Sequence, residues 1–268
     1  MNNKTILITG ATDGIGKQTA FELAKLGHKV IVHGRNKKKS QEVTNELIQL
    51  SGNENLKHVY SDLSSFEEIQ KMSDCIKKKY DRIDVLINNA AVFMNDRVII
   101  PNGFETSFMV NHMAVFALTD ALLPLLKETK TSRIVNVSSM AQSGTMDFDN
   151  LNGEKYFDAY NAYAVSKLEN VLFTYKLHRM LKGKSPTVNC LHPGVISTKL
   201  LHAGWGIGGG SLEQGASTSV FLASSDEVEN VSGKYFVNSQ QQKSSAISYD
   251  QKIQDRLWEI SEELMEGH

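Results

Sequence analysis

Short apolar runs rich in β-branched residues alternate with amphipathic stretches along almost the whole chain. The runs that we predict as strands are Thr5 to Thr9, Lys29 to His33, Leu56 to Tyr60, Ile83 to Asn88, Arg133 to Ser138, Thr187 to His192 and Lys234 to Asn238. Helical periodicity covers about residues 14 to 26, 38 to 50, 65 to 79, 104 to 128, 158 to 182, 213 to 224 and 249 to 265. Because parallel strands need crossover connections, this alternation predicts an α/β fold with a Rossmann-like, doubly wound parallel sheet of about seven strands.

Size and charge restrict the kind of protein further. No Pro/Ser-rich linker divides the 268 residues, so we predict a single domain spanning residues 1–268. The formal net charge of −1 offers no broad attraction to nucleic acid, which we do not expect as a partner. The two cysteines show no CxxC spacing and the eight histidines no HExxH spacing, so we predict neither a disulfide framework nor a metal site.

The N-terminal residues bear on location. Strand-forming residues begin by Thr5 and leave no room for a signal peptide, and we identify no apolar run approaching the roughly 18 residues that span a bilayer. We therefore expect a cytoplasmic protein without a membrane anchor.

A glycine cluster follows the first predicted strand, in the stretch from Thr9 to Gly16. Gly10, Gly14 and Gly16 lie between the apolar strand and an amphipathic helix, which is the context that a phosphate-binding turn requires. Backbone N–H groups at a helix N-terminus bind a pyrophosphate there. The cluster predicts dinucleotide binding; the alternative is an ordinary turn between a strand and a helix.

The end of the second strand bears on which nicotinamide cofactor binds. An NAD site places an acid there for the ribose 2′-hydroxyl, whereas an arginine suits a 2′-phosphate. This chain has no acid there and has Arg35, so we expect NADP(H) in preference to NAD(H). Asp62, after the third strand, is placed to accept from the adenine amino group, or it caps the helix beginning near Ser65.

A tyrosine and a lysine one helical turn apart point to proton transfer. Of the eight tyrosines, only Tyr163 has a lysine four residues on, at Lys167, and a nearby cation favours the phenolate form. Ser139 follows the fifth predicted strand, where we expect its hydroxyl to face the same cleft. Alone, the Tyr/Lys pair is equally consistent with a surface contact, but the three side chains together indicate a catalytic site.

These motifs resemble the short-chain dehydrogenase/reductase family over almost the full chain. The matching motifs are TGxxxGxG at Thr9 to Gly16, NNA at Asn88 to Ala90, Val110-Asn111-His112, the serine and YxxxK, and Pro193-Gly194 with Thr198. The 24-residue step from Ser139 to Tyr163 and the stretch Leu191 to Val195 look like the retinol dehydrogenase and protochlorophyllide reductase-like branch.

The resemblance implies residue roles. Tyr163 would be the general acid or base, Lys167 its cationic neighbour, and Ser139 the donor to the substrate oxygen. Asn111 would hold a relay water, although a helix-interior amide bonded to backbone is the alternative. The predicted cofactor-binding residues are Gly10, Thr12, Asp13, Gly14, Ile15, Gly16, Arg35, Asp62, Leu63, Asn89, Ala90, Tyr163, Lys167, Pro193, Gly194, Val195 and Thr198.

The predicted substrate contacts are mainly apolar. They are Phe93, Met94, Met140, Ala141, Gln142, Phe157, His202 and Trp205. Such a lining suits a hydrophobic aldehyde or ketone, while the alternative is that these side chains pack against the sheet. The stretch Gly204 to Gly210 is predicted as a loop, either a flexible excursion or a substrate lid.

We therefore expect a carbonyl/alcohol oxidoreductase that uses NADP(H). The alternatives are reduction of a carbon-carbon double bond and a non-catalytic NADP-binding sensor; a nucleotide-sugar epimerase is disfavoured by the glycine spacing. Long helices near residues 104 to 128 and 158 to 182 carry apolar residues on more than one face, so we also expect a homodimer or homotetramer.

Overall fold

An eight-stranded sheet organises residues 3–267, the part of the chain that the computed structural model describes. Its strand order is β3-β2-β1-β4-β5-β6-β7-β8, with parallel pairing throughout except between β7 and β8. The strands are β1 (Thr5–Ile8), β2 (Lys29–Gly34), β3 (Leu56–Tyr60), β4 (Val85–Asn88), β5 (Arg133–Val137), β6 (Thr187–His192), β7 (Tyr235–Val237) and β8 (Gln240–Gln242). The predicted single-domain, doubly wound α/β fold is thereby confirmed.

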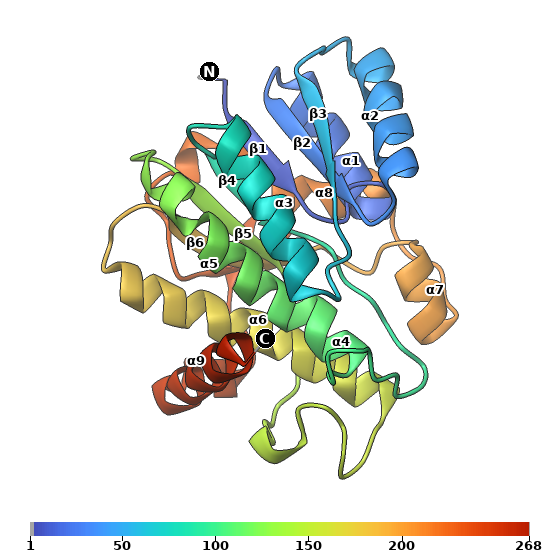
Figure 1. The fold of residues 1–268 in the computed structure, drawn as a ribbon, viewed down its shortest axis with the longest axis vertical. Helices are drawn as coiled ribbons and strands as arrows, with labels where there is room; N and C mark the ends of the chain where they lie inside the picture. Colours follow the sequence, from blue (N-terminus) through green and yellow to red (C-terminus); the bar gives the residue numbers. More distant parts are fainter. Residues whose placement is uncertain (1–2, 268) are drawn as a thin grey trace.

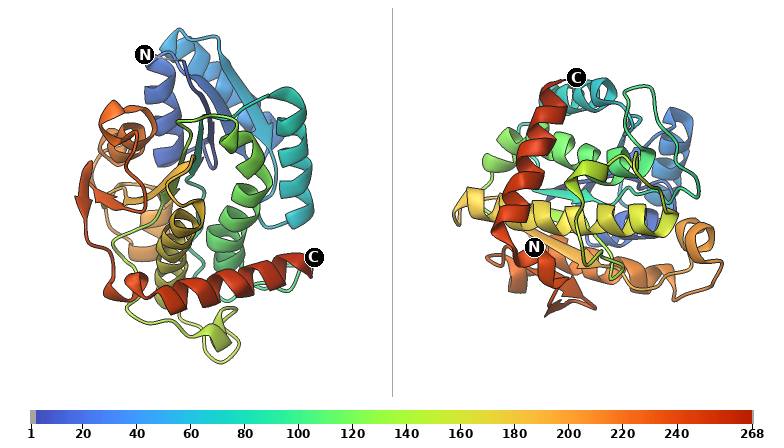
Figure 2. Two further views of the ribbon diagram at one scale, coloured as in Figure 1. Left: turned by 90° about the vertical axis from the view of Figure 1, so that its left-hand side faces the viewer. Right: turned by 90° about the horizontal axis from the view of Figure 1, so that it is seen from below.

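Helices cover both faces of the sheet (Figures 1 and 2). One face packs against α1 (Gly14–Lys25), α2 (Lys37–Ser51) and α8 (Leu212–Ser224). The other packs against α3 (Phe66–Lys79), α5 (Ala114–Lys127) and α6 (Ala159–Leu181). Successive strand side chains point to opposite faces, so Ile6 and Ile8 join the first layer and Leu7 joins the second. Both faces of each central strand are therefore buried.

Six short elements and the C-terminal helix complete the fold of residues 3–267. They are α4 (Thr106–Phe108), the π-helical turn η1 (Met109–Met113), η2 (Phe148–Asn150), α7 (Lys199–Trp205), η3 (Asp226–Val228), η4 (Ala246–Tyr249) and α9 (Gln251–Glu266), which crosses α6 in Figure 2. Helix starts follow local chemistry, since Asn36, Ser65 and Ser211 each accept a backbone N–H as N-caps.

Two elements differ from the sequence-based expectation. Strand β8 consists of three exposed glutamines, a composition without strand periodicity, and it pairs only because the turn at Asn238 and Ser239 folds it back onto β7. Residues 199–205, which lie outside every predicted helix, form α7, whose first turn is capped by the Thr198 hydroxyl.

One helical stretch is also more apolar than we expected. Thr106–Lys127 is long and apolar enough to cross a membrane, the single such stretch within residues 3–267. Two-thirds of its most apolar window is buried inside the fold, as in the core helices of soluble proteins, which pass the same test. Length and composition therefore do not distinguish a helix that crosses a membrane from a core helix buried inside a fold.

Candidate active site

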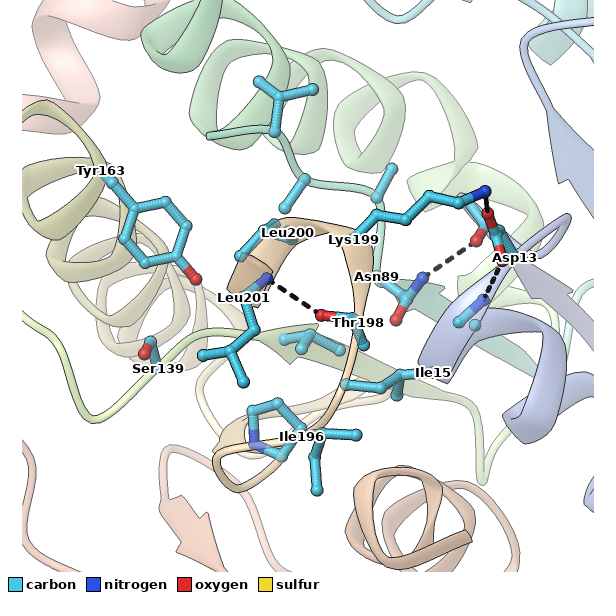
Figure 3. Close-up of a pocket in the computed structure, with 18 of the residues that line it drawn as sticks. Asp13, Ile15, Asn89, Ser139, Tyr163, Ile196, Thr198, Lys199, Leu200 and Leu201 are labelled. Carbon is cyan, nitrogen blue, oxygen red and sulfur yellow. Dashed lines mark hydrogen bonds and ion pairs between the residues drawn. The ribbon is translucent and has the colours of Figure 1, made fainter. Parts of the chain in front are cut away.

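A cleft of about 1030 Å³ opens at the carboxyl ends of the strands. The glycine-rich turn after β1, the ends of β2, β4, β5 and β6, and the helices α6 and α7 surround it. This is the edge where parallel α/β sheets bind ligands. Figure 3 shows Tyr163 and Ser139 at one end of the cleft and Asp13 and Asn89 at the other, with residues 198–201 between them.

The glycine-rich turn is shaped by its missing side chains. A Cβ on Gly10, which has φ +63°, would lie 2.9 Å from Ala90 Cα, and one on Gly16 would lie 2.3 Å from Asn89 Nδ2. Asn89 Nδ2 donates to the carbonyl of Thr9 at 2.8 Å, so its amide braces the turn. These contacts bring α1 close to the sheet and leave the backbone of the turn facing the cleft.

Asp13 occupies the helix end of the same turn. Its carboxylate caps α1, accepting from Gly14 N at 2.9 Å, and forms an ion pair with Lys199 of α7. The Lys199 hydrogen bond, foremost among several effects, holds the pKa of Asp13 below its usual range. Thr12, Gly14 and Ile15 line the cleft beside it.

The other end of the turn is tied to the sheet by His33, which we did not identify from the sequence. Its Nδ1 accepts from Gly10 N at 3.2 Å, and its Nε2 lies 3.1 Å from Ser61 Oγ. Burial lowers the pKa of His33 to about 4, so the imidazole is neutral and one nitrogen accepts while the other donates. In the sequence His33 is indistinguishable from an ordinary strand residue.

The residues predicted to bind the adenosine end line the cleft. Arg35 follows β2 with an exposed side chain, and no acid stands in that position. Asp62 and Leu63 lie next to it. Asp62 Oδ1 accepts from Ser64 N at 2.9 Å, and the helix α3 is capped by Ser65 rather than by Asp62.

The catalytic candidates lie together at the opposite end of the cleft from Asp13. Tyr163 and Lys167 of α6 are 6% and 2% exposed, and Lys167 Nζ lies 5.5 Å from the centre of the Tyr163 ring. Ser139 follows β5, and its hydroxyl hydrogen bond lowers the pKa of Tyr163. Burial is the larger effect and raises that pKa to about 12. The sequence led us to expect that the Lys167 cation has the main influence on the pKa of Tyr163. In the structure the main influence is burial.

Lys167 is held by the main chain. Its ammonium donates to the Val137 carbonyl at 3.0 Å, and burial lowers its pKa to about 8. Ser138 Oγ donates to the Lys167 carbonyl at 2.7 Å, which fixes α6 against the end of β5. Lys167 therefore remains mainly cationic near pH 7 although it is fully enclosed.

Asn111 lies in the π-helical turn η1. Its Oδ1 accepts from Val92 N at 2.8 Å, while its Nδ2 donates to the Val92 carbonyl at 3.0 Å and to Ser166 Oγ at 3.0 Å. The amide side chain thus bonds to protein groups, which was our alternative for this residue. Its visible effect is to hold the segment after β4 against α6.

Aromatic rings close the cleft above Tyr163. The Trp205 ring centre lies 5.5 Å from that of Tyr163, 5.3 Å from that of Phe93 and 6.0 Å from that of Tyr160. Tyr160 was not among our predicted residues, although its position three residues before Tyr163 places it on the same helix face. The contacts make an apolar wall beside the phenol.

The remaining predicted substrate residues divide into two groups. Met140, Ala141, His202 and Trp205 line the cleft, together with Pro193, Gly194, Val195 and Thr198 from the cofactor set. Gln142 instead donates to the Ser139 carbonyl at 2.8 Å, and Met94 is half-buried outside the lining. Phe157 lines a different, smaller cavity, because the segment that carries it folds beneath α6.

The stretch Gly204 to Gly210 is more ordered than a flexible loop. Gly204 lies inside α7, and Gly210 N donates to the Val195 carbonyl at 2.8 Å, which closes the base of the excursion. Tyr163, Phe93 and Asp13 all contact α7 side chains. Trp205 and Ile207 of this stretch line the cleft.

Known proteins resemble this chain in sequence and in fold. A family model described as short chain dehydrogenase matches residues 4–205. Human retinol dehydrogenase 14 is 38% identical over 98% of this chain and 86% of its own length.

This chain belongs to the short-chain dehydrogenase family.

Its relatives place it in the retinol dehydrogenase-like branch of that family of NAD(P)(H)-using oxidoreductases, as the sequence motifs had indicated. Among solved structures, an uncharacterised protein from Mycobacterium paratuberculosis matches with a TM-score of 0.82 and 30% identity, covering 98% of this chain and 93% of its own. A short-chain dehydrogenase from Escherichia coli complexed with NADPH matches with a TM-score of 0.74 and 26% identity, covering 90% and 98%.

Proposed function

We propose that this short-chain dehydrogenase is an NADP(H)-dependent enzyme that interconverts a hydrophobic aldehyde or ketone and the corresponding alcohol. The observation that carries the proposal is the enclosed group of Ser139, Tyr163 and Lys167 beside the apolar wall of Trp205, Phe93 and Tyr160. A phenol, a hydroxyl and a cation in an apolar cleft match a reaction in which a carbonyl oxygen gains charge and a proton.

The cleft fits a dinucleotide. The tight approaches at Gly10 and Gly16 leave no room for side chains, so the backbone of the turn lies close to the cleft. Asp13 occupies the N–H of Gly14, and the N–H groups of Ile15 and Gly16 in the first turn of α1 remain for a pyrophosphate. Arg35 beside Gly34, with no acid at the end of β2, supports a 2′-phosphate and hence NADP(H). When bound, the nicotinamide supplies a hydride to the carbonyl carbon or accepts one from the alcohol.

The side chains of the protein would handle the proton. The raised pKa of Tyr163 keeps the phenol protonated, which is the form that donates to a carbonyl oxygen in the reductive direction. Ser139 would donate a hydrogen bond to the same oxygen as negative charge grows on it. Lys167, still cationic near neutral pH, would stabilise the phenolate that Tyr163 becomes after donation.

A substrate screen tests this function. NADPH absorbance would be followed with apolar aldehydes, ketones and enones, using the wild type and Tyr163→Phe. We expect turnover of aldehydes or ketones by the wild type, and loss of turnover with nearly unchanged NADPH affinity in the variant. Turnover of enones alone would establish double-bond reduction instead. NADPH binding without turnover of any substrate would favour a sensor.

A further inference from the structure

A second, smaller cavity of about 40 Å³ lies away from the cleft, between α6, the start of α4 and the segment of residues 145–158. Four carboxylates line it, from Glu105, Asp147, Asp158 and Glu169. Glu105 and Glu169 are 2% and 1% exposed. The proposed reaction uses none of these groups.

The hydrogen bonds around this cavity leave three oxygens unsatisfied. Glu105 Oε2 accepts from Phe108 N at 2.9 Å, but Glu105 Oε1 and both carboxylate oxygens of Glu169 are buried without a partner within residues 3–267. The other two acids are occupied as local caps, since Asp147 accepts from Asp149 N and Asp158 from Asn161 N.

Positive charge is missing from the same place. Of the described residues that line the cavity, none is Lys, Arg or His. Lys155, which is half-exposed and does not line the cavity, lies 3.9 Å from the Asp147 carboxylate. Tyr156 is the remaining titratable lining residue. Across residues 3–267, no three His, Cys, Asp or Glu side chains converge in a way that could hold a metal ion.

Two ionised carboxylates that line one small cavity out of water are strongly unfavourable, whereas a single proton removes one charge and converts that carboxylate into a hydrogen-bond donor. Burial, followed by the charge of Glu105, raises the pKa of Glu169 well above its usual value. A protonated Glu169 would satisfy a buried oxygen of Glu105 and its own hydroxyl at once.

We infer that Glu169 is a neutral carboxylic acid that shares one proton with Glu105 and so ties α6 to the start of α4. Glu169 lies on the helix that carries Tyr163 and Lys167, and Glu105 caps the helix that runs into the turn carrying Asn111. The pair is therefore a positioning device for the catalytic side chains. That second statement rests on the proposed function, whereas the shared proton does not.

The shared proton is tested by unfolding as a function of pH. Because the pKa of Glu169 is raised in the folded state, the folded chain binds more protons than the unfolded chain at any pH between the two pKa values. The free energy of unfolding therefore falls as pH rises from the ordinary glutamate pKa to the folded-state pKa of Glu169. The unfolding equilibrium constant of the wild type should increase by up to about tenfold per pH unit relative to Glu169→Gln, which has no proton to lose. Glu262→Gln, an exposed position on α9, is the matched control and should keep the wild-type slope.

Two outcomes would overturn the inference. Equal pH slopes in the wild type and Glu169→Gln would mean that Glu169 does not hold an extra proton. Stabilisation of the wild type, but not of Glu169→Gln, by millimolar Ca²⁺ would mean that a cation and not a proton neutralises the cavity.

If Glu169→Gln does not fold, ¹³C-carboxyl NMR of the wild type decides, since a Glu169 resonance that titrates in the ordinary glutamate range refutes the shared proton. As these readouts need no substrate, they stand apart from the test of enzyme function.

The pH dependence of kcat tests whether the Glu105–Glu169 pair positions the catalytic side chains. If the pair positions the catalytic side chains, kcat of the wild type relative to kcat of Glu169→Gln should fall as pH rises through the folded-state pKa of Glu169, where the folded chain gives up the shared proton. The titration of Lys167 is common to both proteins and cancels in this ratio, and Glu262→Gln should follow the wild type. An unchanged profile in Glu169→Gln would show that the pair is purely structural.

Discussion

The indole of Trp205 stands nearly perpendicular to the ring of Tyr163, with the ring centres 5.5 Å apart and the planes at 81°. One ring comes from α7 and the other from α6. Trp205 is thus one of the rings packed against the proposed acid, and burial of that phenol raises its pKa to about 12. It also makes α7 part of the substrate wall.

Trp205→Ala should weaken the binding of bulky apolar substrates. Aromatic contacts contribute about 0.5–1.5 kcal/mol beyond area burial, so we expect roughly a tenfold higher KM for a long apolar aldehyde and little change for a small one. Added hydration should also lower the pKa of Tyr163. Steady-state kinetics with both aldehydes measure this, with Leu50→Ala, 61% exposed on α2, as the control. Equal effects on both aldehydes would mean that Trp205 does not form the wall.

Carbonyl reduction should fail at alkaline pH because of Lys167. Its pKa of about 8 means that the cation is present below that pH and is lost as pH rises through it. We expect kcat/KM to fall about tenfold per pH unit above roughly pH 8. The free energy of unfolding should instead rise as pH increases above about 8. In that range Lys167 is protonated in the unfolded chain and increasingly neutral in the folded one, so the unfolded chain binds more protons. Lys167→Arg does not titrate there and should lose this limb of the profile; an identical limb in that variant would assign the titration to another group.

Arg35→Ala should separate the two cofactors. A hydrogen bond to a charged group contributes about 1.5–3 kcal/mol, so the NADPH Kd should rise roughly 10- to 100-fold while the NADH Kd changes little. Fluorescence titration of each nucleotide measures this. Lys38→Ala removes a nearby charge from a side chain that is 87% exposed and should leave both constants unchanged. Equal losses for NADPH and NADH in Arg35→Ala would rule out recognition of the 2′-phosphate.

Gly16→Ala should damage both the turn and the fold. The new methyl group would lie 2.3 Å from Asn89 Nδ2 and 2.4 Å from the Gly10 carbonyl oxygen, so the turn must shift. Overpacking of this kind costs about 1–3 kcal/mol, and we expect a lower Tm together with weaker dinucleotide binding. Gly144→Ala meets no atom within 4 Å and is the control. A Gly16→Ala variant with wild-type Tm and affinity would contradict the packing argument.

Much of the fold follows from local pattern. The alternating apolar runs of the parallel strands, the glycine turn and the Tyr163–Lys167 spacing depend on residues close together in the chain, which is why they were predictable. Strand β8 was not, since Gln240 to Gln242 have no strand character and pair only because β7 is beside them. Tyr160 was missed and Phe157 misplaced because the lining of a cavity depends on how distant segments cross.

The amino-acid sequence by itself determined the class of fold and the family, and it predicted the candidate residues for dinucleotide binding and proton transfer, because motif and periodicity are local properties. The tertiary structure decided how those groups behave. Burial raises the pKa of Tyr163 to about 12, lowers that of Lys167 to about 8 and leaves Glu105 and Glu169 facing one cavity. Desolvation depends on which side chains surround a group in space, and spacing along the chain does not contain that information.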